Sequence, residues 1–150
     1  TRRCTNRRFV MRYLLDTNII SNFVKPTPSQ SLLKWMGDQN DADLFIATLT
    51  IGEIWRGILE APIGKRRADL ERWFAGPEGP AALFVGRVLP FDAPAAIIWA
   101  RFMAEGKAAG RPRSSMDMII ASVGEVHNCV VVTDNTRDFE GIETLNPVRG

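Results

Sequence analysis

Short apolar runs alternate with longer amphipathic segments along this chain, and this alternation limits the possible folds more than any other feature of the sequence. Buried strands are predicted at residues 12–15, 44–47, 88–90 and 130–133, and an edge strand at residues 143–145. Strands that alternate with helices indicate an α/β fold with a mainly parallel central sheet and helices on both faces. Ligands of such sheets bind beyond the carboxyl ends of the strands, so we expect the functional residues there.

Helical patterns fill the segments between the predicted strands. They cover residues 19–24, 29–39, 48–60, 65–74, 115–126 and a stretch that has Pro94 in its first turn and ends near residues 106–110. We expect Thr48 or Thr50 to cap the helix that follows the second strand. Residues 76–80 and 110–113 are rich in Gly or Pro and predict loops, the second of them mobile.

Size and composition indicate one globular domain. A chain of 150 residues, 45% hydrophobic and 24% charged, can bury roughly two-thirds of its unfolded surface. Its apolar runs are far shorter than the roughly 20 residues needed to cross a bilayer, so we expect no membrane association. The two cysteines, Cys4 and Cys129, are isolated in sequence, which predicts neither a disulfide framework nor a zinc site, and the expected location is the cytoplasm.

The first ten residues differ from the rest of the chain in charge. They lack acidic residues and contain four arginines, Arg2, Arg3, Arg7 and Arg8. The charge of +4 on this segment is larger than the net charge of +2 on the whole chain, so the remaining residues are net negative. A strong strand pattern begins directly after them, so we expect the domain to span residues 11–150. Residues 1–10 are then a disordered arm or an extension from an upstream start site. The alternative is a basic arm that contacts nucleic acid.

Three carboxylates occupy positions that lead to the carboxyl edge of the predicted sheet. Asp16 directly follows the first strand, where the ordinary explanation is an N-cap of the next helix. Glu53 lies near the first turn of the helix after the second strand, on a polar face that solvent exposure alone would explain. Asp117 lies in the first turn of a later helix, beside the small residues Ala121 and Gly124, where the helix macrodipole favours an acid.

A further polar group follows the strand at residues 130–133. It contains Asp134, Asn135 and Asp138, for which turn propensity is the ordinary explanation. Several carboxylates at one edge of one sheet cannot all remain ionised without a compensating charge. Oxygen ligands favour Mg²⁺, with Mn²⁺ as a substitute, and such an ion can activate water for attack on a phosphodiester. The sequence leaves open whether one or two ions bind.

Four short motifs resemble, in this order, those of the PIN-domain family. They are LLDTN at 14–18, IGE at 51–53, SMDMIIA at 115–121 and VVVTDNTRDF at 130–139. The segments that resemble the VapC- and FitB-type toxins of this family in particular are RVLPFDAPAAIIWARF at 87–102 and LNP at 145–147. The resemblance covers roughly residues 11–147 and implies a single PIN-like domain.

The resemblance also implies a role for each matching residue. The three metal-binding acids of the family match Asp16, Glu53 and Asp117. The fourth acidic position falls on Asn135, with Asp134 before it, a departure that weakens the case for a second metal. Asn135 can still bind a metal through its carbonyl oxygen or orient a water, so it completes the expected catalytic set. Supporting positions around the metal are expected at Thr17, Asn18, Thr133, Asp134 and Asp138.

The resemblance implies an activity and partners. Toxins of this type are Mg²⁺-dependent endoribonucleases that usually form homodimers. A cognate antitoxin holds them inactive by covering the acidic site with its tail, and its other half binds operator DNA. Arg111 and Arg113 are candidates for binding RNA because they lie just ahead of Asp117, although a solvated surface is the ordinary explanation for such charges.

Two other functions compete with an RNA-cleaving toxin. A phosphoacceptor signalling domain also places acids and Mg²⁺ at the edge of a parallel sheet, but it needs paired acids after the first strand and a lysine after the last. The motif DTN at 16–18 offers one acid, and Arg137 but no lysine follows the last buried strand. A non-catalytic module, which binds an antitoxin or another DNA-binding protein without cutting RNA, stays open because of Asn135.

Overall fold

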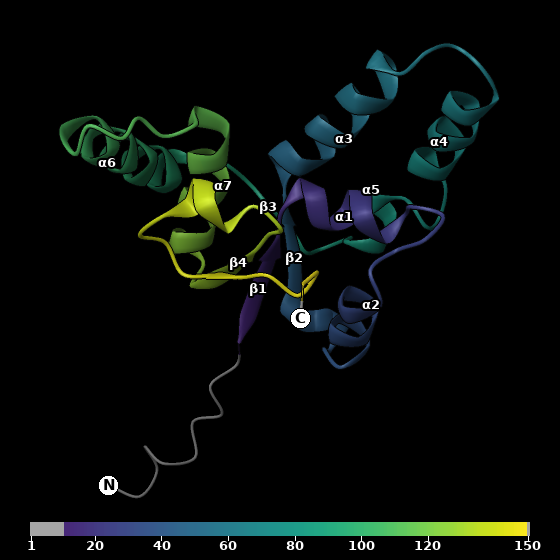
Figure 1. The fold of residues 1–150 in the computed structure, drawn as a ribbon, viewed down its shortest axis with the longest axis horizontal. Helices are drawn as coiled ribbons and strands as arrows, with labels where there is room; N and C mark the ends of the chain where they lie inside the picture. Colours follow the sequence, from purple (N-terminus) through teal and green to yellow (C-terminus); the bar gives the residue numbers. More distant parts are fainter. Residues whose placement is uncertain (1–10, 150) are drawn as a thin grey trace, which may run out of the picture.

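A parallel β-sheet forms the centre of the protein, for which the computed structural model describes residues 11–149 (Figure 1). Its strands are β1 Arg12–Leu15, β2 Leu44–Ala47, β3 Val88–Leu89, β4 Cys129–Val132 and β5 Thr144–Leu145. They lie side by side in the order β3-β2-β1-β4-β5, and every neighbouring pair is parallel. The predicted sheet is therefore confirmed, whereas the expected N-terminal arm and Cys4 lie outside the described residues.

The helices follow the predicted segments closely. They are α1 Thr17–Phe23, α2 Gln30–Gly37, α3 Thr48–Glu60, α4 Lys65–Ala75, α5 Pro80–Leu83, α6 Ala93–Ala108 and α7 Ser115–Val126, with short 3₁₀ turns η2 Asp41–Asp43 and η3 Thr136–Phe139. In the part of the chain that the structure describes, no helix is both long and apolar enough to span a membrane.

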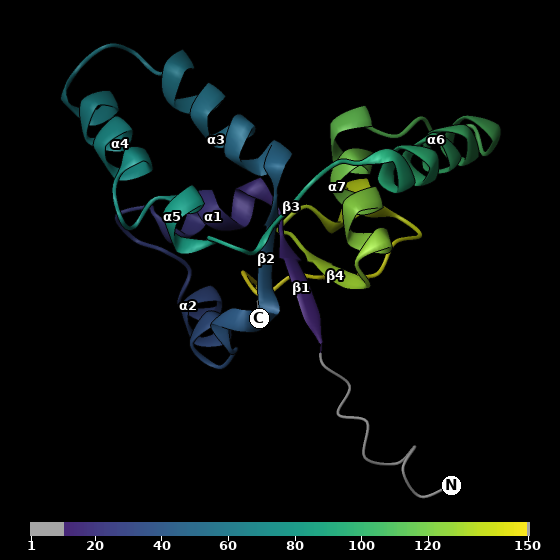
Figure 2. The same ribbon diagram turned by 180° about the vertical axis from the view of Figure 1, so that it is seen from behind.

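Helices cover both faces of the sheet, as predicted. Successive residues of a strand point to opposite faces, so each buried strand contributes to two cores. Leu14 of β1 and Val131 of β4 pack in one core with α6 and α7, and Leu15 and Val132 pack in the other with α1 to α5. Figures 1 and 2 show α6 and α7 on one side of the sheet and α1, α3 and α4 on the other.

Helix α7 packs more tightly than its sequence pattern predicts. The apolar spacing of residues 115–126 places Met116, Ile119, Ile120 and Val123 on one inward face, yet Met116 and Ile119 are only half-buried, while Met118, outside this face, is fully buried. The reason is that α7 lies between the sheet and α6, so side chains on both of its sides lose contact with water. Gly124 permits this close approach, because a Cβ atom there would lie 3.3 Å from Cγ2 of Val131.

Two helix starts differ from the prediction. The N-cap of α3 is Ala47, which offers no side-chain hydrogen bond, so the expected cap by Thr48 or Thr50 is wrong. The Thr48 hydroxyl instead donates to the carbonyl of Leu89 at 3.3 Å, which ties α3 to β3. Pro80, expected to end a loop, begins the short helix α5, because its fixed φ suits a first helical turn.

Candidate active site

Asp16 stands at the carboxyl end of β1, where the sequence placed it. It is only 6% exposed and caps α1, because the backbone N–H of Thr17 donates to its Oδ1 at 2.8 Å. The Thr133 hydroxyl donates to its Oδ2 at 2.9 Å. Burial raises the pKa of Asp16 by more than these two hydrogen bonds lower it. The N-cap role is therefore real, and it leaves a buried carboxyl group that is costly to ionise.

Asn18 and Thr133 hold Asp16 in place and join α1 to the end of β4. The Asn18 amide donates to Oγ1 of Thr133 at 3.0 Å and more weakly to Oδ2 of Asp16 at 3.4 Å. Oδ1 of Asn18 accepts the backbone N–H of Asp134, and Oγ1 of Thr133 accepts that of Asn135, both at 3.0 Å. The two residues thus fix the carboxylate and the chain that follows β4, the arrangement expected of supporting groups.

Glu53 reaches the same place from the second turn of α3. The Thr17 hydroxyl donates to Oε1 of Glu53 at 3.0 Å, so Thr17 binds Asp16 through its backbone and Glu53 through its side chain. Glu53 is half-buried, and its pKa is raised mainly by this burial and further by the charge of Asp117, against the Thr17 hydrogen bond. Solvent exposure alone therefore does not explain Glu53 on the polar face of α3, because this side chain is half-buried and hydrogen-bonded to Thr17.

Asp117 approaches from the first turn of α7. Ser114 is the N-cap of this helix, and its hydroxyl accepts the backbone N–H of Asp117 at 3.3 Å. Burial raises the pKa of Asp117, and the charges of Asp16 and Asp138 raise it further. Sequence reasoning missed Ser114, although a serine three residues before an acid at a helix start is a recognisable capping signal.

The three carboxylates act on one another electrostatically. After desolvation, the causes of their raised pKa values include Glu53 acting on Asp16, Asp117 on Glu53 and Asp16 on Asp117. Within residues 11–149, no three Asp, Glu, His or Cys side chains stand close enough to enclose a metal ion. The oxygen-only donor set still fits Mg²⁺, because this ion keeps several waters and takes only one or two carboxylates directly.

The three polar residues after β4 have different surroundings. Asp134 faces the C-terminal segment, where Oδ1 accepts the Asn146 amide at 3.2 Å and lies 3.4 Å from Nε of Arg149. The exposed Asn135 donates its side-chain amide to the carboxylate of Asp138. Asp138 is therefore the member of this group whose charge acts on Asp117, whereas the side-chain hydrogen bond of Asn135 is made with Asp138.

The placement of Asn135 leads to a prediction. Replacing Asn135 by alanine should lower kcat/KM for the RNA cleavage that the resemblance implies by less than tenfold, below the ~10–100-fold loss typical of groups that orient a metal ligand. Steady-state cleavage of one RNA substrate by the variant and the unchanged protein measures this. A fully inactive, folded variant would show instead that Asn135 binds the metal or the substrate directly.

Arg111 and Arg113 lie in the loop between α6 and α7, which is tied to α6 and to the turn after η3 by their side chains. Arg113 is largely buried and donates to the carbonyl of Phe102 at 2.8 Å and to that of Glu140 at 3.3 Å. Arg111 forms an ion pair with the carboxylate of Glu140 at 2.6 Å. Arg113 therefore holds the loop, and Arg111 is the more accessible of the two.

Comparison with known proteins places this geometry in a family. The sequence matches the PIN domain over residues 13–144. It is 35% identical to VapC ribonuclease Y4jK of Sinorhizobium fredii and 32% identical to toxin FitB of Neisseria gonorrhoeae; each match covers 89% of this chain and 96% of the relative. The fold is similar to that in the structure of FitAB bound to an IR36 DNA fragment, with a TM-score of 0.81, 30% identity, and coverage of 90% of this chain and 94% of that one. This chain belongs to the PIN-domain family.

Proposed function

We propose that this protein is a metal-dependent endoribonuclease and the toxin of a toxin–antitoxin pair. The observation that carries the proposal is the approach of Asp16, Glu53 and Asp117 from three different elements, each with a pKa raised by burial and by a neighbouring acid. Buried like charges are costly to a fold, and a bound cation offsets that cost. The names of the similar proteins, a ribonuclease and a toxin, support the same class of activity.

Each residue of the site has a defined task in this proposal. Asp16, Glu53 and Asp117 would hold Mg²⁺, or Mn²⁺ in its place. The bound ion would supply an activated water and stabilise the charge that develops on the phosphodiester. Thr17 orients Asp16 and Glu53 together, while Thr133 and Asn18 orient Asp16 from the β4 side. These hydrogen bonds keep the carboxylates in position without a rearrangement when substrate arrives.

A cleavage assay tests the proposal directly. The purified protein should cut single-stranded RNA in the presence of Mg²⁺, lose this activity in EDTA, and recover it when Mn²⁺ replaces Mg²⁺. The same metals should raise the melting temperature, because a ligand that binds only the folded state stabilises it. RNA that stays intact across a broad set of substrates, with no thermal shift by either metal, would overturn the proposal.

The proposed partners are an RNA substrate, a cognate antitoxin and a second copy of this chain. Operator DNA would be contacted only through the antitoxin, in line with the DNA-bound FitAB complex to which this fold is similar. Expression of the chain alone should slow bacterial growth, and co-expression of a DNA-binding protein encoded beside it should restore growth. Growth unaffected by the chain alone would contradict the toxin role.

One observation favours a second candidate, a PIN-like module that binds its partner without cutting RNA. The fourth acidic position of the family holds Asn135 here, and its side chain contacts Asp138 rather than the three acids. A protein that binds the co-expressed partner tightly but cleaves no RNA with either metal would establish this alternative.

A further inference from the structure

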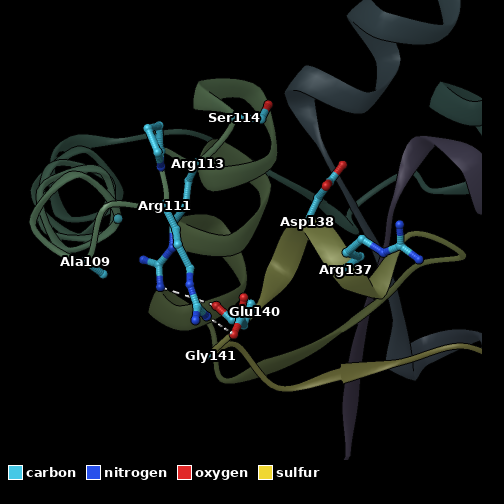
Figure 3. Close-up of a pocket in the computed structure, with 10 residues that line it drawn as sticks. Ala109, Arg111, Arg113, Ser114, Arg137, Asp138, Glu140 and Gly141 are labelled. Carbon is cyan, nitrogen blue, oxygen red and sulfur yellow. Dashed lines mark hydrogen bonds and ion pairs between the residues drawn. The ribbon is translucent and has the colours of Figure 1, made fainter.

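A cavity of about 400 Å³ lies directly beside the acidic site (Figure 3). Its walls are the end of α6, the loop that follows it, η3 and the turn after η3. Two of its lining residues also act on Asp117: Ser114 caps its helix, and Asp138 raises its pKa. Figure 3 shows Ser114 and Asp138 at one end of the cavity and Arg111 meeting Glu140 at the other. The three acids do not line the cavity, which extends from these two neighbours of Asp117 to a wall that carries arginines.

The backbone of Arg111 is fixed by the end of α6. The N–H of Gly110 donates to the carbonyl of Lys107 at 3.1 Å, and the N–H of Arg111 donates to that of Gly106 at 2.9 Å. With φ of +70° at Gly110, these two bonds form a Schellman motif that closes the helix. Gly106 is required for this approach, because a Cβ atom there would lie 2.9 Å from the carbonyl oxygen of Arg111.

Arg113 stabilises the same arginine-bearing wall of the cavity through hydrogen bonds to backbone carbonyls. Its side chain is 21% exposed, and its guanidinium donates to the carbonyls of Phe102 and Glu140, so it connects α6 with the turn after η3. These hydrogen bonds use the guanidinium donors of Arg113 to stabilise the fold. We therefore treat it as a positioning residue and do not assign the phosphate contact to it.

Arg111 is differently placed. Its side chain is 73% exposed, and its contact with the carboxylate of Glu140, itself 69% exposed, is a surface ion pair. Such pairs contribute little to stability, because water solvates both charges well. A phosphate can therefore replace Glu140 at small cost, and the planar guanidinium can bind it through two parallel hydrogen bonds.

We propose that this cavity binds the nucleotide next to the scissile bond, with the guanidinium of Arg111 on its phosphate and Glu140 as the internal competitor for that guanidinium. The inference rests on the proposed function, since it takes RNA as the substrate and the three acids as the place of cleavage. Arg137 also lines the cavity, but its side chain extends away from Arg111 in Figure 3, so the phosphate contact is assigned to Arg111.

Binding measurements without catalysis test this assignment. The full chain carrying Asp117→Asn, in EDTA, is titrated with a fluorescein-labelled single-stranded RNA of mixed sequence, alone and together with Arg111→Ala or Glu140→Gln. Arg111→Ala should raise Kd about tenfold and lower the slope of log Kd against log salt by about 0.7, the value for one lost phosphate contact. Glu140→Gln frees Arg111 and should change Kd in the opposite direction, toward tighter binding.

Matched controls come from α4, on the other side of the sheet. Arg72 is 71% exposed and paired with Asp69, much as Arg111 is paired with Glu140. Arg72→Ala and Asp69→Asn remove equivalent charges and should leave Kd within twofold. The inference is overturned if Arg111→Ala leaves Kd unchanged, if Arg111→Ala and Glu140→Gln shift it in the same direction, or if the α4 variants shift it equally.

Cleavage by the protein with Asp117 intact is measured separately on the same RNA, so that the two proposals fail in different ways. Normal Mg²⁺-dependent cleavage with no effect of Arg111→Ala on Kd or KM overturns the phosphate contact and leaves the nuclease. Opposite shifts in Kd for the Arg111 and Glu140 variants without any cleavage overturn the nuclease and support an RNA-binding cavity.

Discussion

Replacing Asp117 by asparagine should lower kcat/KM for RNA by at least about 100-fold, while the protein stays folded. Loss of a group that merely orients a metal ligand costs ~10–100-fold, so loss of a metal-binding charge should cost at least the upper part of this range. Asparagine has nearly the same shape, and the backbone bond from residue 117 to Ser114 is retained. Cleavage rates with saturating Mg²⁺, together with far-UV circular dichroism, measure both parts of this prediction.

The stability of this variant should change little, because two effects oppose each other. Removing an acid from the first turn of α7 loses a favourable interaction with the helix macrodipole, about 0.3–1 kcal/mol. It also removes the repulsion between Asp117 and the charges of Asp16 and Asp138. We expect a melting temperature within about 3 °C of the unchanged protein, since ~1 kcal/mol corresponds to about 2–4 °C at this size.

Glu125 provides the matched control for Asp117. It lies on the same helix, is well exposed, and faces Arg101 at 3.9 Å rather than the acidic site. Glu125→Gln should therefore leave cleavage within twofold. If Asp117→Asn cleaves RNA within tenfold of the unchanged protein, Asp117 is no part of the metal site, and its place in the first turn of α7 is explained by helix stability alone.

The strands and their parallel direction could be predicted because both follow from local patterns, whereas their order in the sheet, β3-β2-β1-β4-β5, was not predicted. Buried runs such as residues 44–47 and 130–133 stand out by their apolar content, and helices between them require parallel crossovers. The sequence pattern could not predict that α6 packs against α7 as a further layer. Met118 is fully buried in a cluster that also contains Phe102 of α6 and Phe139 of η3.

The candidate site could be predicted only at the level of its acids. Asp16 and Asp117 carry local signals, one after a strand and one at a helix start. The hydrogen bonds that orient them link residues far apart in the chain, such as Thr133 to Asp16, and depend on the pairing of β1 with β4. The same limit explains Asp134: its contacts with Asn146 and Arg149 arise from the path of the C-terminal segment.

Replacing Asp16 by asparagine should abolish cleavage, by at least about 100-fold, and should also stabilise the metal-free protein. Because burial raises the pKa of Asp16 above its ordinary value of 3.8, the folded protein binds this proton more tightly than the unfolded chain does. The stability of the unchanged protein therefore falls as the pH rises from about 4 through the raised pKa, and the penalty is fully present above that pKa. Asparagine avoids this penalty and can still cap α1 through its one amide oxygen, but its NH2 group cannot accept the hydrogen bond that Thr133 donates to Oδ2 of Asp16, which reduces the gain.

The expected gain is on the order of 1 kcal/mol at pH 7, or about 2–4 °C in Tm, and it should vanish below pH 4. Urea unfolding in EDTA at several pH values measures it. Asp134→Asn is the control: Asp134 is partly exposed and paired with Arg149, so its variant should gain nothing. Addition of Mg²⁺ should stabilise the unchanged protein and not Asp16→Asn, because the ion binds only where the carboxylate remains. An Asp16→Asn protein that is less stable than the unchanged protein at pH 7 in EDTA would show that burial of the charge does not cost the fold stability. A variant that is still stabilised by Mg²⁺ would show that Asp16 serves α1 as a cap and does not hold a cation.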